Sequence, residues 1–158
     1  MKKVTIMCGV SGSGKSYEAM KLQLSAPGES RVVSADHYFT DRSGSYAFSV
    51  ALLGEAHAAC LRRFLDEVQG GTAHVIVDNT NTTIAEIAPY VAIAQAYGYE
   101  VEIRTMHARS IDLESCAQRN THGVSLEAIS GQHQRLTSRR WPFHWEHGAV
   151  TFSVMSFK

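Results

Sequence analysis

Apolar residues follow two patterns that alternate along the chain. Short apolar runs that end at a polar residue or a glycine predict strands at Val4–Cys8, Arg31–Ser34, His74–Asp78, Glu100–Met106 and Ala149–Met155. Segments with helix-compatible composition or helical apolar spacing predict helices over 17–24, 47–68, 84–97, 111–120 and 125–139. Strands and helices that alternate from end to end favour an α/β fold, with a mostly parallel central sheet of about five strands covered on both faces.

The longest predicted helix covers residues 47–68. Its apolar residues form one stripe at offsets of three and four: Leu52, Leu53, Ala56, Ala59, Cys60, Phe64 and Val68. Gly70 and Gly71 end the helix. The strand that follows, His74–Asp78, is apolar until its last residue, which predicts an interior position in the sheet. Near the end of the chain, an aromatic turn is expected over Trp141–Trp145.

Composition changes this picture little. The 158 residues suggest one domain over 1–158, and a formal net charge of zero gives no global basic field that would attract nucleic acid. Cys8, Cys60 and Cys116 are widely spaced in apolar surroundings and are interpreted as reduced core thiols. No signal peptide or membrane-length apolar run is found, so we expect a cytoplasmic protein without a membrane partner.

A phosphate-binding loop follows the first strand. Gly9-x-x-x-x-Gly14-Lys15-Ser16 fills every fixed position of this motif, with a strand before it and a helix after it. Backbone N–H groups and the helix N-terminus would bind phosphate, Lys15 would reach the β- and γ-phosphates, and Ser16 would ligate Mg²⁺. The residues expected to bind ATP are Gly9, Val10, Ser11, Gly12, Ser13, Gly14, Lys15, Ser16, Tyr17 and, from later in the chain, Arg119.

Two carboxylates follow the next predicted strands. Asp36 could take a proton from an acceptor hydroxyl, or it could cap a helix or lie in a solvated turn. Asp78 could orient Mg²⁺ or its water shell, or the segment after it could serve only to cap the next helix. Asn79 and Asn81 could support the site or form the turn. Since the carboxyl ends of parallel strands meet at one edge, these groups should lie beside the phosphate loop.

Basic residues occur in the last third of the chain. Arg119, before the break at Thr121–Val124, could neutralise a transferring phosphate or simply be a cation at a helix C-terminus. Arg135, Arg139 and Arg140 could form a basic patch, but the solvated side of a helix is favoured. His144 and His147 lack a ligand partner at metal-site spacing, so aromatic packing is favoured over a metal there.

Four segments together resemble a known family. The phosphate loop, Ser34–Phe39, Val75–Asn81 and Gln118–Val124 occur in the order found in the P-loop kinase domain of polynucleotide kinases, NEDD4-binding-protein-2-like ATPase domains and their phage relatives. The resemblance covers roughly residues 2–136. It implies a three-layer P-loop NTPase fold with a helical lid.

The resemblance also implies a function: an ATP- and Mg²⁺-dependent kinase acting on the 5′-hydroxyl of a DNA or RNA end. Lys15 and Ser16 would hold the phosphates and magnesium, Asp36 would be the general base, and Arg119 would belong to the lid. Two positions depart from the phage enzyme, which has arginines where this chain has His122 and Phe39. The latter arginine helps to hold the nucleic-acid end. A kinase of nucleosides, nucleotides or other metabolites therefore stays open, as does an ATP-binding regulatory ATPase that transfers nothing.

Overall fold

The central element of the structure is a parallel sheet of five strands. The computed structural model describes residues 1–106, 111–148 and 150–155. Its strands are β1 (Lys3–Cys8), β2 (Ser30–Val33), β3 (His74–Asp78), β4 (Glu100–Met106) and β5 (Val150–Met155). They pair in parallel in the order β2-β3-β1-β4-β5, which confirms the predicted α/β fold and the interior position of β3. The predicted first residue of the last strand, Ala149, lies outside the described residues.

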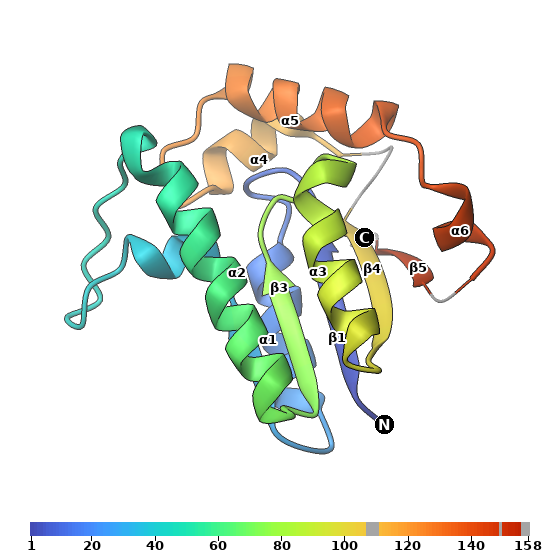
Figure 1. Cartoon of the computed structure of the whole chain (residues 1–158). Helices are drawn as coiled ribbons and strands as arrows, with labels where there is room; N and C mark the ends of the chain where they lie inside the picture. Colours follow the sequence, from blue (N-terminus) through green and yellow to red (C-terminus); the bar gives the residue numbers. More distant parts are fainter. Residues whose placement is uncertain (107–110, 149, 156–158) are drawn as a thin grey trace.

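Helices cover both faces of the sheet and one of its ends. They are α1 (Lys15–Ser25), α2 (Leu53–Gly70), α3 (Ile84–Ala96), α4 (Leu113–Arg119), α5 (Leu126–Ser138) and α6 (Phe143–Glu146), with single 3₁₀ turns at Ala35–Tyr38 and Val50–Leu52. Helices α2 and α3 pack on one face and α1 on the other, while α4 and α5 lie across the end at which the phosphate loop emerges (Figure 1). Among the described residues, no helix is long and apolar enough to cross a membrane.

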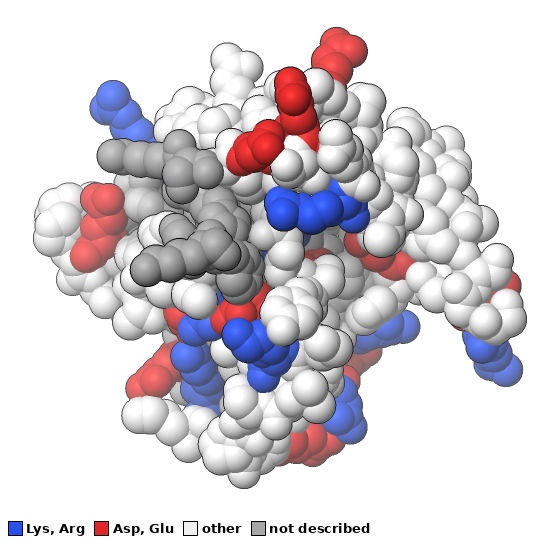
Figure 2. All heavy atoms as spheres, turned by 180° about the vertical axis from the view of Figure 1, so that it is seen from behind, with Lys and Arg blue, Asp and Glu red and all other residues white. Residues whose placement is uncertain are grey.

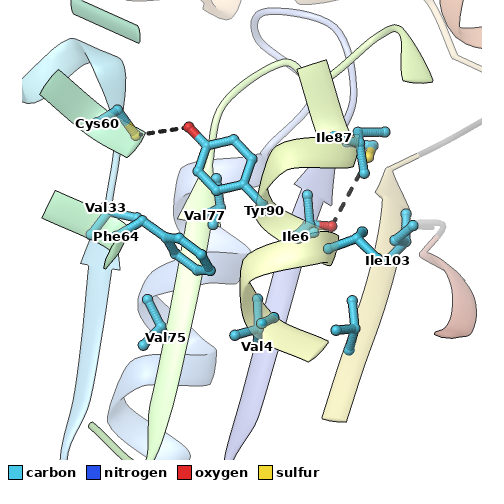
Figure 3. Packing of buried hydrophobic residues seen from close by; sticks show 14 of the residues in the cluster. Val4, Ile6, Val33, Cys60, Phe64, Val75, Val77, Ile87, Tyr90 and Ile103 are labelled. Atoms are coloured by element: carbon cyan, nitrogen blue, oxygen red, sulfur yellow. Dashed lines mark hydrogen bonds between the residues drawn. The ribbon is translucent and has the colours of Figure 1, made fainter. Parts of the chain in front are cut away.

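The alternation of side chains along the strands builds the main core. Val4 and Ile6 of β1 point toward α2 and α3, where Phe64 is fully buried and stacks edge-on with Tyr90 at 5.0 Å between ring centroids (Figure 3). The three cysteines are buried thiols, as predicted. Cys60 belongs to this core and accepts a hydrogen bond from the Tyr90 hydroxyl at 3.4 Å.

The opposite face of the sheet carries a buried network of charges. Glu102 of β4 is 6% exposed, and its carboxylate contacts Lys3 Nζ at 2.8 Å and Arg104 Nη2 at 2.9 Å. Arg104 also reaches Glu18 of α1 at 2.7 Å, and Ser153 of β5 donates a hydrogen bond to Glu102 at 2.6 Å. The network therefore joins β1, β4, β5 and α1 on the side where apolar packing is smaller.

Two predicted elements differ from the structure. Helix α2 begins at Leu53 rather than near Ala47, because Ala47 N–H donates to Phe39 and Thr40 pairs with Tyr46, which folds the preceding segment back on itself. Residues 52 and 53, counted in the apolar stripe, are each 38% exposed. The aromatic turn near the end of the chain contains the short helix α6, in which Trp145 is buried.

Candidate active site

The phosphate loop joins β1 to α1 and wraps around the N-terminus of that helix. Gly12 and Gly14 have φ of 78° and 91°, in the left-handed region that favours glycine, and Gly14 is the N-cap residue directly before α1. The loop therefore presents the free N–H groups and positive dipole end of α1, a combination that binds anions. Gly9 and Val10 do not line the cavity: Gly9 N–H donates to Thr80, and Val10 is buried against Cys116 and Ile129.

A cavity of about 750 Å³ opens above this loop, within the range of small-molecule sites. The sequence-predicted residues Asp36, Asp78 and Arg119 share it with the loop, although they come from distant parts of the chain. The full lining is Ser11, Gly12, Ser13, Gly14, Lys15, Ser16, Tyr17, Asp36, Asp78, Asn79, Thr80, Ile111, Asp112, Ser115, Arg119, Asn120, Thr121 and His122.

Lys15 is held against the loop. Its ammonium donates to the Val10 carbonyl at 2.8 Å, and the residue is 8% exposed. Burial lowers the pKa of Lys15 from its ordinary value, while the negative charges of Asp78 and Asp36 act in the opposite direction. The local negative charge thus supports the cationic form in a position that is shielded from water.

Asp78 ends β3 and is 8% exposed. Its Oδ1 is buried without a hydrogen-bond partner among the described residues, although the side chain lines the cavity. The capping alternative for this segment is excluded, because Thr83 caps α3 in a reciprocal pair with Glu86. An unpartnered buried carboxylate oxygen in the same cavity as Ser16, an exposed residue with a hydroxyl group, offers oxygen ligands that suit Mg²⁺ or its water shell.

The two asparagines after β3 tie neighbouring strand ends together. Asn79 Oδ1 accepts from Ala35 N–H at 2.8 Å, directly before Asp36. Asn81, which has a φ of 45°, donates from Nδ2 to the Met7 carbonyl at 2.7 Å. These contacts fix the loops that carry both carboxylates; Asn79 also lines the cavity, whereas Asn81 supports the site from outside the lining.

Asp36 extends into the cavity from the 3₁₀ turn after β2. Capping of that turn is performed by Ser34, whose hydroxyl accepts from Asp36 N–H, so the Asp36 carboxylate is not needed as a cap. The side chain is 50% exposed and has two neighbours: Tyr46 Oη donates to Oδ1 at 3.1 Å, and His122 Nε2 lies 3.5 Å from Oδ2. Its position near Lys15 and the loop allows it to meet a hydroxyl bound in the same cavity.

Helices α4 and α5 press directly on the phosphate loop. A Cβ atom at Gly12 would lie 2.1 Å from the Cys116 carbonyl oxygen of α4, so only glycine permits this approach. Gln132 of α5 accepts from Ser11 N–H at 2.8 Å and donates to Ser11 Oγ at 3.2 Å. Arg119, the last residue of α4, lines the cavity, which fits both the phosphate and the helix-terminus interpretations.

Several contributors escaped sequence analysis. Gln132 and Tyr46 belong to segments without a motif, and only the fold brings them to the loop and to Asp36. Arg139 is neither a solvated residue nor part of a free basic patch: it donates to the Asn81 carbonyl and to Thr105 Oγ1, each at 2.9 Å, and lies over Trp141. The aromatic-packing interpretation near the chain end fits His147, whose ring stacks on Phe143.

Sequence comparison identifies relatives over most of the chain. The family described as an AAA domain (AAA_33) matches residues 4–141. Human NEDD4-binding protein 2 is 37% identical over 128 residues, which make up 80% of this chain and 7% of that protein. The chain thus corresponds to a small part of this much longer relative.

Solved structures share the fold at low sequence identity. A chain of the Pnkp1/Rnl/Hen1 RNA repair complex superposes with a TM-score of 0.67 at 16% identity, covering 85% of this chain and 44% of that one. The Mycobacterium tuberculosis APS kinase CysC, in complex with AMPPNP and APS, gives a TM-score of 0.58 at 20% identity, covering 98% and 88%. A sugar kinase from Janibacter sp. HTCC2649 gives 0.58 at 15%, covering 99% and 86%. With its parallel sheet, phosphate loop and helices over the loop, the chain belongs to this AAA domain family and has a P-loop kinase fold.

Proposed function

We propose that the protein is an ATP-dependent kinase that transfers the γ-phosphate to a hydroxyl group, with the 5′-hydroxyl of a DNA or RNA end as the preferred acceptor. The observation that carries this proposal is the shared cavity of Asp36, Lys15 and the phosphate loop. A protein that only bound nucleotide would not need a half-exposed carboxylate across from its phosphate site. A kinase needs one to accept the proton of the attacking hydroxyl.

The residues in the cavity suit both ATP and magnesium. The loop from Ser11 to Tyr17 would hold the phosphates through its N–H groups, and Ser16 and Asp78 would hold Mg²⁺ or its water shell. When bound, Mg²⁺ supplies positive charge to the phosphate oxygens. Lys15 and Arg119 would stabilise the charge that develops during transfer, and Asp36 would receive the proton of the acceptor.

Two findings support a nucleic-acid end as the acceptor. The segments around Asp36 and Asp78 resemble those of polynucleotide kinases, and the fold is shared with a chain of an RNA repair complex. Arg119 and the segment after it line the side of the cavity formed by α4, where a second substrate could meet Asp36. The donor and the acceptor would therefore approach one another between the sheet edge and α4.

A small-molecule acceptor is the second candidate, and Phe39 favours it. The phage enzyme has an arginine at this position, whereas Phe39 is 5% exposed and packs against Tyr38, Tyr46 and Phe48. No cation at this position can therefore hold a nucleic-acid phosphate. On the described part of the face in Figure 2, Lys and Arg lie interspersed with Asp and Glu, in keeping with zero net charge. Fold neighbours that act on small molecules include an APS kinase.

A transfer assay with labelled γ-phosphate separates these possibilities. The acceptors are 5′-hydroxyl DNA and RNA oligonucleotides, nucleosides, nucleoside monophosphates, adenosine 5′-phosphosulfate and water. Label on oligonucleotides supports the preferred acceptor, and label on monomers alone would replace it with the small-molecule candidate. Release of phosphate to water without any labelled acceptor would overturn the kinase proposal and leave a regulatory ATPase.

The Asp36→Asn variant tests the role of the carboxylate. It should lose about 10² to 10⁴ in turnover, because the general base is removed, while binding of a fluorescent ATP analogue stays close to that of the wild type. Asp66→Asn, on the exposed side of α2, is the matched control and should leave both quantities unchanged. Full activity in Asp36→Asn would show that another group accepts the proton.

A further inference from the structure

We propose that Tyr46 and His122 are positioning residues for Asp36, and that together they orient its carboxylate so that Oδ2 meets the acceptor hydroxyl when α4 and α5 are closed over the phosphate loop. This inference rests on the proposed kinase function. It adds two residues with no part in the phosphate-loop motif. One belongs to the loop before α2, and the other follows α4.

Asp36 needs such support because its own surroundings do not fix it. Its side chain is half exposed, and the backbone contacts of its 3₁₀ turn leave the carboxylate free to rotate about two side-chain torsions. Tyr46 Oη contacts Oδ1 at 3.1 Å, and His122 Nε2 faces Oδ2 at 3.5 Å. Tyr46 therefore fixes one carboxylate oxygen by a hydrogen bond, and His122, from an element far away in the chain, faces the other.

Tyr46 is itself well fixed. The Tyr46 backbone pairs with that of Thr40 in an isolated bridge, and the Tyr46 ring packs edge-on against buried Phe39 at 6.1 Å between centroids. Burial and the adjacent Asp36 charge and hydrogen bond raise the pKa of Tyr46 to about 12. The phenol consequently remains protonated near neutral pH and donates its hydrogen to Oδ1. Because Oδ1 is engaged, Oδ2 is the oxygen left to accept the proton of an acceptor hydroxyl.

His122 connects this oxygen to the segment that follows α4. Its ring lies 4.5 Å from the Tyr46 ring, so the three side chains form one cluster, and His122 also lines the cavity. Helix α4, which precedes His122, presses on the phosphate loop because its Cys116 carbonyl lies against Gly12. Seating of α4 on the loop thus brings His122 to Asp36. The orientation of the base is coupled in this way to the helices that close over the nucleotide site.

Kinetics of conservative variants test the two roles. Tyr46→Phe keeps the ring and removes only the donor, so turnover should fall roughly tenfold or more, as expected for loss of a hydrogen bond to a charged group, while the KM for ATP changes less than about twofold. Tyr38→Phe is the matched control: its hydroxyl donates to Glu55 at 2.9 Å outside the cavity, and its loss should change neither constant. His122→Phe should reduce turnover, and His122→Gln, which restores a donor, should recover most of it.

An NMR measurement tests the cluster without using activity. The His122 ring signal, identified by its absence in His122→Gln, should shift in Asp36→Asn and in Tyr46→Phe but not in Tyr38→Phe. Equal turnover of Tyr46→Phe and wild type would overturn the positioning role, and so would a His122 signal that does not shift in Asp36→Asn or Tyr46→Phe. Either result would leave the proposed kinase function standing. Absence of transfer by the wild type to every acceptor would instead overturn the proposed function.

Discussion

Replacement of Glu102 by glutamine should make the stability of the protein much less sensitive to acid. Burial alone would raise the pKa of Glu102, but hydrogen bonds from Lys3, Ser153 and Arg104, together with the Arg104 charge, outweigh it and lower the pKa from an ordinary value of 4.5 to about 2. A carboxylate at this position is therefore strongly preferred over the neutral acid in the folded protein.

The magnitude follows from this difference in pKa. One pKa unit corresponds to about 1.4 kcal/mol, so ionised Glu102 contributes about 3 kcal/mol to the free energy of unfolding at pH 7. Because the folded pKa lies below the unfolded one, this contribution is fully present above the unfolded value and is lost as the pH falls through the folded value. By about pH 3 it should be less than half as large.

Urea unfolding of wild type and Glu102→Gln between pH 7 and pH 3 measures the effect. Glutamine resembles the protonated acid, so the variant should be less stable by about 3 kcal/mol at pH 7 and approach the wild type in acid. Glu100→Gln, an exposed position on the same strand, serves as the control and should follow the wild type throughout. A difference between wild type and Glu102→Gln that is the same at pH 7 and pH 3 would refute the reasoning.

Three further predictions concern the candidate site. Gly12→Ala should lower the free energy of unfolding by at least about 1 kcal/mol in urea titrations, because a left-handed alanine is strained and its Cβ would collide with the Cys116 carbonyl; unchanged stability would mean that α4 does not press on the loop in solution. Asp78→Asn should raise the Mg²⁺ concentration needed for half-maximal transfer roughly 10- to 100-fold, and EDTA should abolish transfer by both proteins; an identical Mg²⁺ titration would exclude this carboxylate from the metal site. Gln132→Ala should weaken ATP binding about fivefold in calorimetry by releasing Ser11, whereas unaltered affinity would show that the loop holds its shape alone.

The parts of the fold that were predicted correctly are those with strong local signals. The apolar run of β3 and the paired glycines Gly70 and Gly71 at the end of α2 define a strand and a helix end without help from the rest of the chain. The predicted beginning of α2 is wrong, because the helix was extended from Leu53 back to Ala47. The residues in between show no strong helix breaker, but the backbone of Ala47 bonds to that of Phe39, and this contact within the folded segment leaves no mark in the local sequence.

The candidate site likewise contains residues that sequence patterns predict and residues that they do not. The phosphate loop is recognisable from its spacing, and strand ends locate Asp36 and Asp78, because parallel topology gathers these ends at one edge. The roles of these residues stay predictions. Tyr46 and Gln132 could not be found in this way, since a lone tyrosine in a loop or a lone glutamine on a helix has no spacing rule. Gln132 reaches the phosphate loop only because α5 packs on that loop. Tyr46 reaches Asp36 only because the segment before α2 packs against Asp36.

The order of the strands has a consequence for how the chain acquires its shape during synthesis. Strand β1 lies at the centre of the sheet, yet its partners begin only at His74 and Glu100. Of the five strands, β1 is synthesised before both of its partners, and roughly a hundred residues of chain must follow before both of its edges are paired; such distant pairing makes folding slow. The phosphate loop follows β1 directly, so the nucleotide site forms late although its motif is translated before the two strands that pair with β1. A nascent chain stalled before β4 should have the complete motif and no stable nucleotide site.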